Sequence, residues 1–108
     1  MLPYEAAAAS SAMPGLMAPV EIGGRRYFDR GFRNGLSTDL AEGTVVVIEP
    51  LAHFMPGGAG DARVHIVPDE AGRAAIGTDF ADATRWTDCF AAGAAQAVRA
   101  ADEIRAVW

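Results

Sequence analysis

The pattern of hydrophobic and polar positions changes along this chain, and it predicts a helix and a hairpin first. Residues 4–12 are alanine-rich and contain no helix-breaking residue, so they predict a helix. Met13-Pro14-Gly15 ends it, because a residue before proline avoids the helical conformation. Residues 21–28 place Gly23-Gly24 between short stretches suited to strands, which is typical of a β-hairpin.

Two strands are predicted in the middle of the chain. The β-branched run 44–48 is uninterrupted by polar residues after its first position, and it predicts a strand buried on both faces. Residues 51–60 form a loop rich in proline and glycine. Residues 62–67 alternate in part and predict a second strand, which Pro68 ends.

Helices are predicted around and after these strands. Ser37, Thr38 and Asp39 each offer an N-cap for a short helix, with Glu42 completing a capping box and Gly43 ending the helix. A second short helix over 69–76 has Asp69 as its cap. A long helix over 87–107 carries an apolar stripe made of Phe90, Ala94, Ala97, Ala101 and Ile104. The mixture of elements predicts an α/β fold.

Composition narrows the function classes. The 108 residues suffice for one domain or part of one, and their formal charge of −5 does not suit a nucleic-acid partner. The single cysteine, Cys89, can form no internal disulfide, which favours a reducing compartment such as the cytoplasm. No run of residues is long and apolar enough to span a membrane, and the first residues do not have the pattern of a secretory signal.

Several short motifs follow one another in a characteristic order. The predicted helix and Pro-Gly turn lead to Tyr27-Phe28-Asp29, a glycine follows at position 31, and Ser-Thr-Asp-Leu-Ala occupies 37–41. This order resembles the second half of a patatin-like lipid acyl hydrolase. Later stretches that echo the family are Glu49-Pro50-Leu51, Ile66-Val67-Pro68-Asp69 and Trp108. The resemblance implies that residues 1–108 form one partial domain, the C-terminal half of a three-layer α/β/α fold.

Asp29 is the candidate catalytic residue. Taken alone, it is an aspartate at a turn, where its side chain would bond nearby amides. The resemblance implies instead that it is the base of a Ser–Asp dyad that hydrolyses lipid acyl esters with no metal or organic cofactor. Arg30 stands where the family has the first glycine of Asp-Gly-Gly. We expect its guanidinium to lower the pKa of the Asp29 carboxyl and its side chain to deny the backbone a positive φ.

The other half of the dyad is absent from the sequence. No Gly-x-Ser-x-Gly motif occurs, and Ser37, the nearest imitation, lacks the second glycine and is better explained as a helix cap. Ser10 and Ser11 fit a packing role, and the family's glycine-rich oxyanion loop is missing. The expected partners are therefore a lipid or acyl-ester substrate and the missing N-terminal half. The family's crossover helix is also missing between 48 and 64, so we expect the second strand to pair differently or to be poorly ordered.

Other residues that could carry chemistry are better explained by structure. His53 and His65 match no metal-ligand spacing, and Cys89 has no catalytic partner nearby in sequence. Residues 57–60 lack the lysine of a phosphate-binding loop. The alternative to a hydrolase fragment is a non-enzymatic remnant or small interaction domain that kept the fold without the chemistry.

Overall fold

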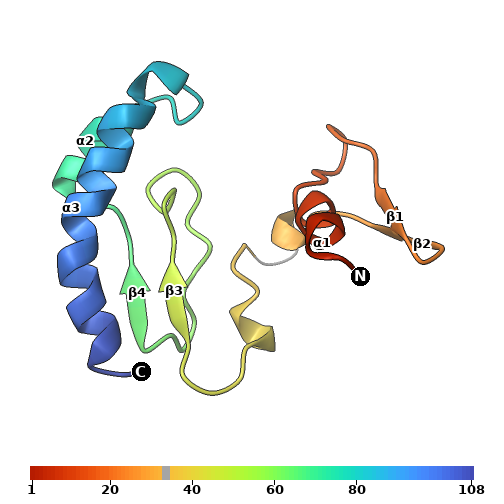
Figure 1. The fold of residues 1–108 in the computed structure, drawn as a ribbon, viewed down its shortest axis with the longest axis horizontal. Helices are drawn as coiled ribbons and strands as arrows, with labels where there is room; N and C mark the ends of the chain where they lie inside the picture. Colours follow the sequence, from red (N-terminus) through yellow and green to blue (C-terminus); the bar gives the residue numbers. More distant parts are fainter. Residues whose placement is uncertain (33–34) are drawn as a thin grey trace. The chain divides into compact units, whose positions relative to one another are not determined.

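Two compact units make up the computed structural model of this chain, which describes residues 1–32 and 35–108 (Figure 1). Unit 1 comprises Met1–Ser37 and unit 2 comprises Thr38–Trp108. Helices and short strands occur in both, which is compatible with the predicted α/β class.

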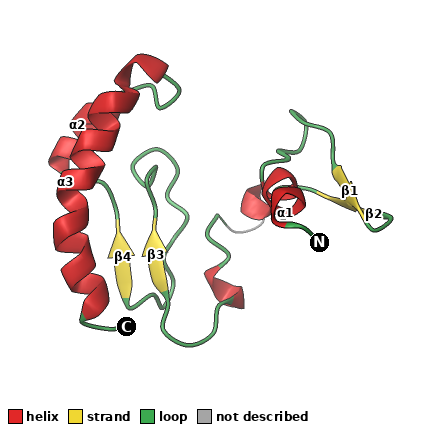
Figure 2. Cartoon of the chain, in the orientation of Figure 1, coloured by secondary structure: helices red, strands yellow, loops and turns green. Residues whose placement is uncertain are grey.

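Unit 1 holds a short helix and a β-hairpin (Figure 2). Helix α1 (Pro3–Ser10) begins at a proline, which is tolerated there because the first helical N–H has no intrahelical partner. The Glu5 carboxylate accepts the N–H of Leu2 at 2.7 Å and so satisfies another donor at this end. Strands β1 (Val20–Ile22) and β2 (Arg25–Tyr27) pair antiparallel.

The hairpin turn follows directly from its two glycines. Gly23 and Gly24 have φ values of 57° and 74°, and two consecutive positive φ angles define the turn that matches the twist of a hairpin. The prediction of a helix followed by a hairpin is confirmed. A one-turn 3₁₀ helix, η1 (Arg30–Phe32), follows β2.

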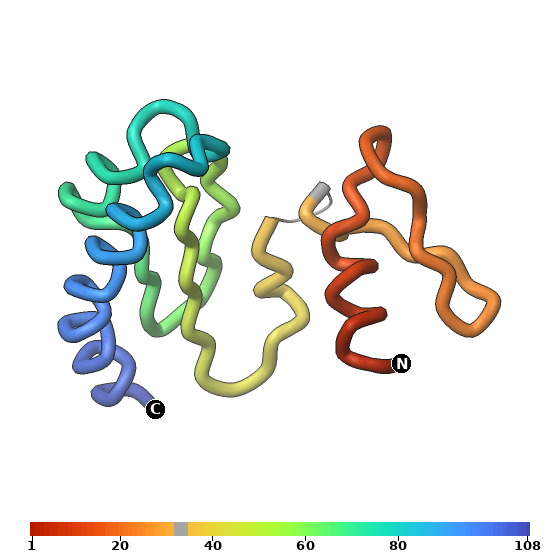
Figure 3. The backbone as a smooth tube through the Cα atoms, turned by 45° about the horizontal axis from the view of Figure 1, so that its top comes forward, coloured from red at the N-terminus to blue at the C-terminus, as the bar shows by residue number. Residues whose placement is uncertain are grey.

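Unit 2 is built around a parallel pair of strands. β3 (Val46–Ile48) pairs with β4 (Val64–Ile66), and Val47 lies opposite His65. The expectation that the second strand pairs differently is wrong. Residues 49–63 provide the dozen or more residues that a parallel connection needs, although they contain no helix (Figure 3).

The strand β3 is covered on one face only. Val47 is 7% exposed, whereas its neighbour Ile48 is 63% exposed on the opposite face. The prediction of a strand buried on both faces is therefore wrong. The physical reason is that α2 (Glu70–Ile76) and α3 (Trp86–Arg105) leave an open groove on that face, and Ile48 lines it.

The predicted helix over 69–76 is confirmed as α2 (Glu70–Ile76). The carboxylate of its N-cap residue, Asp69, accepts the N–H of Gly72 at 2.8 Å. The predicted helix with a capping box around Asp39 is reduced to one 3₁₀ turn, η2 (Thr38–Leu40). Another 3₁₀ turn, η3 (Ala83–Arg85), leads into the long helix α3 (Trp86–Arg105).

The face of α3 toward β4 and α2 matches the predicted stripe in part. Ala97, Ala101 and Ile104 line the space beside β4 and α2, and the residues that line it with them are Trp86, Cys89, Gly93, Gln96 and Ala100. Phe90, which is 78% exposed, does not line it. Alanine is nearly uninformative about which side of a helix is buried, because alanines surround this helix on most sides.

Gln96 joins α3 to the end of β4. Its side-chain amide donates to the carbonyl oxygen of Val67 at 2.7 Å, and its Oε1 accepts the N–H of Asp69 at 3.2 Å. One glutamine thus satisfies a backbone acceptor and a backbone donor on either side of Pro68, where the chain leaves β4 and starts α2.

Arg85 joins the start of α3 to the end of α2. Its Nη1 donates to the carbonyl oxygens of Ala75 at 2.9 Å and Ala74 at 3.2 Å, which lie in the last turn of α2. These carbonyls have no partner within their own helix, so the cation caps them. Gly77 leaves room for it: a Cβ there would lie 3.0 Å from the guanidinium.

We predict that Gln96→Ala lowers the free energy of unfolding of the chain by about 1–3 kcal/mol, because it leaves two part-buried backbone groups without partners. Urea unfolding followed by circular dichroism measures the change. Glu103→Ala, an exposed position on the same helix, is the matched control and should change stability by less than about 0.5 kcal/mol. Equal stability of the two variants would contradict the assigned role of Gln96.

Candidate functional site

The backbone of Asp29 is fixed against the end of α1. Two residues after β2, the N–H of Asp29 donates to the carbonyl oxygen of Ala12 at 2.9 Å. Ala12 is only 2% exposed, so this bond ties the strand exit to one of the most buried points of unit 1. The Asp29 side chain itself is partly buried.

The carboxylate of Asp29 is held by the turn that follows it. Its Oδ1 accepts the N–H of Gly31 at 2.7 Å, the arrangement by which aspartate stabilises a turn. A Cβ on Gly31 would lie 3.1 Å from this oxygen, a contact tighter than side chains normally make. The glycine at 31 therefore allows the amide to approach the carboxylate closely. Within the part of the chain that the structure describes, the second oxygen, Oδ2, accepts no hydrogen bond.

Arg30 does not strain the turn. It begins the 3₁₀ helix η1, and the only residue other than glycine with a positive φ in the described segments is Ser37, at 52°. Arg30 therefore has no positive φ, which agrees with the expectation that its side chain denies the backbone that conformation. The glycine requirement lies one residue later, and its cause is the distance to Asp29.

Neither Ser10 nor Ser11 donates its hydroxyl to the Asp29 carboxylate. The hydroxyl of Ser11 donates to the carbonyl oxygen of Ala7 at 3.0 Å within α1, and Ser10 is exposed in the last turn of the same helix. Ser37 precedes the 3₁₀ turn η2. The structure thus places the predicted base in a defined turn, and no hydrogen bond between described residues joins a serine hydroxyl to it.

A second cluster, which the sequence analysis did not identify, surrounds Glu49. Only 5% of Glu49 is exposed, and its Oε2 lies 2.8 Å from Nε2 of His65. Its Oε1 accepts the N–H of Gly57. Glu49 follows β3 directly and His65 occupies the centre of β4, so the parallel register brings the two side chains to the same face of the sheet.

This cluster is an anchor for the loop 49–63. The backbone N–H of Gly57 holds the pKa of the Glu49 carboxyl below its ordinary value, the hydrogen bond and charge of His65 lower it further, and burial opposes both. The signal in the sequence was a glutamate at the end of an apolar run, where a buried charge requires partners. Those partners are 8 and 16 residues away, so spacing could not identify them.

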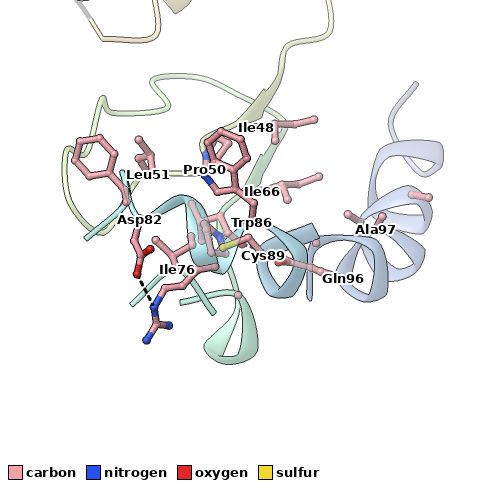
Figure 4. A pocket seen from close by; sticks show the side chains of 18 of the residues that line it. Ile48, Pro50, Leu51, Ile66, Ile76, Asp82, Trp86, Cys89, Gln96 and Ala97 are labelled. Atoms are coloured by element: carbon pink, nitrogen blue, oxygen red, sulfur yellow. Dashed lines mark hydrogen bonds and ion pairs between the residues drawn. The ribbon is translucent and has the colours of Figure 1, made fainter. Parts of the chain in front are cut away.

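An apolar groove lies on the opposite face of the sheet, between the strands, α2 and α3 (Figure 4). Its volume is about 540 Å³. Ile48, Ile66 and Leu51 line it from the strand side, and Trp86 and Cys89 line it from α3. The charged and amide side chains at its border are bonded to one another or to backbone groups, and they are Asp79, Asp82, Arg85 and Gln96. The groove therefore presents an almost wholly hydrocarbon surface.

His53 and Cys89 lie outside the clusters around Asp29 and Glu49. The ring of His53 contacts that of Phe54 in a tilted arrangement, with 4.2 Å between ring centroids, and Cys89 is a free thiol. Gly58 and Gly60 take positive φ values in the loop. No group of three or more histidine, cysteine, aspartate or glutamate residues that could hold a metal ion occurs among the described residues. None of the described helices is long and apolar enough to cross a membrane.

Comparison with known proteins gives no match to any protein family, any curated protein or any solved structure.

We predict that acid weakens unit 2 through Glu49. Its folded-state pKa lies below its ordinary value of 4.5, so its stabilisation is complete above that pH and is lost as the pH falls through the folded-state pKa. At pH 7, Glu49→Gln should lower the free energy of unfolding by about 1–3 kcal/mol, because a neutral amide accepts more weakly from Gly57 and His65.

The measurement is urea unfolding of both proteins at several pH values from 7 down to about 3. The difference between them should shrink once the wild-type carboxyl is protonated. Glu103→Gln is the control, since this exposed glutamate has no buried partner to lose. A difference that stays constant across this range would contradict an anchoring role for the Glu49 charge.

We also predict that Gly31→Ala perturbs the turn at Asp29, because the new Cβ would lie 3.1 Å from Oδ1. The carboxyl carbon of Asp29 should shift in an NMR spectrum, and the Gly31 amide should exchange faster with solvent. Gly93→Ala is the matched control, since a Cβ there meets no atom within 4 Å. That variant should leave the Asp29 signals unchanged and, in the middle of α3, raise stability by about 0.5–1 kcal/mol.

Proposed function

We propose that this chain is the aspartate-bearing, C-terminal part of a patatin-like serine lipid acyl hydrolase. The observation that carries the proposal is the state of Asp29. Its backbone is tied to Ala12, its Oδ1 is held by Gly31, and its Oδ2 accepts no bond from the described residues. A carboxylate oriented in this way is ready to accept a proton from a hydroxyl group.

The proposed reaction needs a serine from a part of the domain other than residues 1–108. Asp29 Oδ2 removes the proton of the serine hydroxyl as the serine oxygen attacks the ester carbonyl carbon. The tetrahedral adduct collapses to an acyl-serine, and the alcohol leaves with the proton that Asp29 returns. Water, deprotonated by the same carboxylate, then cleaves the acyl-serine to release the fatty acid and restore the serine.

The supporting residues fit this assignment in other ways. Gly31 permits the close turn beside the carboxylate, as the second glycine of the family motif would. The hairpin β1–β2 delivers Tyr27, Phe28 and Asp29 in the order of the motif. The proposal also includes a three-layer α/β/α architecture, the serine-bearing half as a partner and a cytoplasmic location. The lone, unpaired Cys89 supports that location.

The second candidate function is binding without catalysis. The apolar groove in unit 2 favours it, because Ile48 and Trp86 are largely exposed there and no catalytic group accompanies them. A remnant or interaction domain of this kind would keep Glu49, His65 and Gln96 for stability and would lose nothing when Asp29 is replaced.

We predict that residues 1–108 alone hydrolyse p-nitrophenyl esters and phospholipids no faster than buffer does, because they contain no Gly-x-Ser-x-Gly nucleophile. Combined with the serine-bearing segment from the same gene, the chain should be active and should react with a fluorophosphonate probe. Asp29→Asn should then lower kcat by about 10²–10⁴-fold, since it preserves the shape of the side chain and removes the base.

Asp61→Asn is the control, because this exposed aspartate lies in the loop before β4. It should leave the rate unchanged. An unchanged rate in Asp29→Asn would reject the dyad, and the second candidate would gain if no serine-bearing segment existed in the gene. Arg30→Gly should raise the rate if the guanidinium acts on the Asp29 carboxylate.

A further inference from the structure

The groove of unit 2 is long and narrow. It runs along α3 from Trp86 to Ile104, and since an α-helix rises about 1.5 Å per residue, this wall is about 27 Å long. Gly93 and Ala97 have little or no side chain and leave room beside the helix, while Ile48 lies on the opposite wall (Figure 4). All of the residues that line the groove belong to unit 2.

The width of the groove limits what can occupy it. Its volume of about 540 Å³ over this length gives a cross-section of about 20 Å². An α-helix is about 10–12 Å across with its side chains, so the groove is too narrow to take one. Carbon atoms in contact lie about 4–4.5 Å apart, so a single unbranched hydrocarbon chain fits a cross-section of this size.

The charged side chains lie at one end of the groove. Asp79, Asp82 and Arg85 all come before the first turn of α3. Among the described residues that line the groove along α3 after Asp88, only Gln96 has an amide or a charge, and it bonds to backbone groups. In Figure 4, Asp82 and Ala97 lie at opposite ends of the groove. This division matches a single-chain amphiphile, which has an apolar chain and a polar head.

The polar end carries a net negative charge, because two carboxylates accompany one guanidinium. The guanidinium of Arg85 is already engaged: Nη1 donates to two carbonyl oxygens at the end of α2, and Nε lies 3.6 Å from Oδ2 of Asp82. Oδ1 of Asp79 accepts the N–H of Ala81 at 2.9 Å, and Oδ2 accepts no hydrogen bond from a described residue. A cationic head would be attracted here, and an anionic head would be repelled.

Two aromatic residues that line the groove neighbour these charges in the sequence. Phe80 follows Asp79 and is 52% exposed, and Trp86 follows Arg85 and is 67% exposed. The ring of Phe80 meets that of Phe54 edge to face, with 5.6 Å between ring centroids. Alkylammonium groups bind to the faces of aromatic rings, tryptophan most strongly, so both rings favour the same kind of head as the carboxylates do.

We propose that the groove is a binding site for a single-chain amphiphile with a cationic head, an alkylammonium compound. Its chain would lie along α3 opposite Ile48, and its head would lie beside Asp79, Phe80 and Trp86. Burial of the chain supplies most of the free energy of binding, and the charge of the head supplies the selectivity. The inference deepens the second candidate function, binding without catalysis, and does not rest on the hydrolase proposal.

An NMR titration of residues 1–108 tests the proposal, with every probe kept below its critical micelle concentration. Decyltrimethylammonium should shift the indole N–H of Trp86 and the amides of Gly93 and Ala97, and the circular dichroism spectrum should stay unchanged. Octyltrimethylammonium, with two methylenes fewer, should bind about 10-fold more weakly. Decyl sulfate has the same chain and the opposite charge, and it should also bind about 10-fold more weakly.

The outcomes separate the ligand class from the site. Equal affinity for decyltrimethylammonium and decyl sulfate would overturn the cationic head and leave the groove as a site for apolar chains. No shift in the groove, or shifts confined to unit 1, would overturn the site itself and remove the support for the second candidate function. None of these results involves Asp29, so the hydrolase proposal is tested separately.

A substitution that fills the groove tests where the chain lies. A Cβ on Gly93 meets no atom within 4 Å, and leucine favours a helix more than glycine does, so Gly93→Leu should fold. It should weaken binding of decyltrimethylammonium at least about 10-fold, because the leucine occupies space equivalent to several methylenes. Val98→Leu is the matched control, since Val98 is 70% exposed and does not line the groove. Full affinity in a folded Gly93→Leu variant would overturn the proposal.

A charge substitution tests where the head lies, and it also decides the question if Gly93→Leu unfolds. Asp79→Asn keeps an oxygen for the N–H of Ala81 and removes the charge, so the preference for decyltrimethylammonium over decyl sulfate should fall to about 2-fold. Asp102→Asn changes the net charge equally near the far end of α3 and should keep the preference. Equal effects of the two substitutions would show that the charge of the whole chain attracts the probe, and would overturn the assigned head position.

Discussion

Unit 2 depends on the parallel pairing of β3 with β4. A pair of parallel strands has apolar side chains on its faces to bury and backbone groups at its edges to hydrogen-bond. It is therefore not expected to be stable without neighbouring elements. The rest of the unit supplies part of that cover. Gln96 engages the chain where it leaves β4, and Glu49 fastens the loop 49–63 to one face through Gly57. The groove face retains exposed apolar side chains, among them Ile48 and Trp86.

Local signals in the sequence were enough to predict most elements. Gly23-Gly24 requires positive φ angles, so the hairpin followed from two residues, and Asp69 marked the start of α2. The packed face of α3 and the burial of β3 could not be predicted in the same way. Both depend on which segments lie nearby in space, and the sequence of an alanine-rich helix or a run of valines does not identify those neighbours.

The candidate residues also differ in whether their partners are near in sequence or only near in space. Asp29 could be identified because its turn partner, Gly31, lies two residues away and within one motif. Its chemical role came from a resemblance and remains a proposal. The Glu49 cluster was missed because a register between strands brings together residues that no motif links. The general requirement that a buried carboxylate have partners predicts such a cluster, but it does not name its members.

The bond from Glu49 to Gly57 also has a consequence for how the chain folds. Residues 49–63 form a single excursion between two strands, and closing such a loop costs conformational entropy before any strand contact forms. The anchor divides this excursion into two shorter segments that meet at one carboxylate. Because the same carboxylate binds His65 in β4, loop closure and strand pairing reinforce each other. The nucleus of folding in unit 2 is therefore expected to contain the charged side chain of Glu49, on the same face of the sheet as the buried Val47.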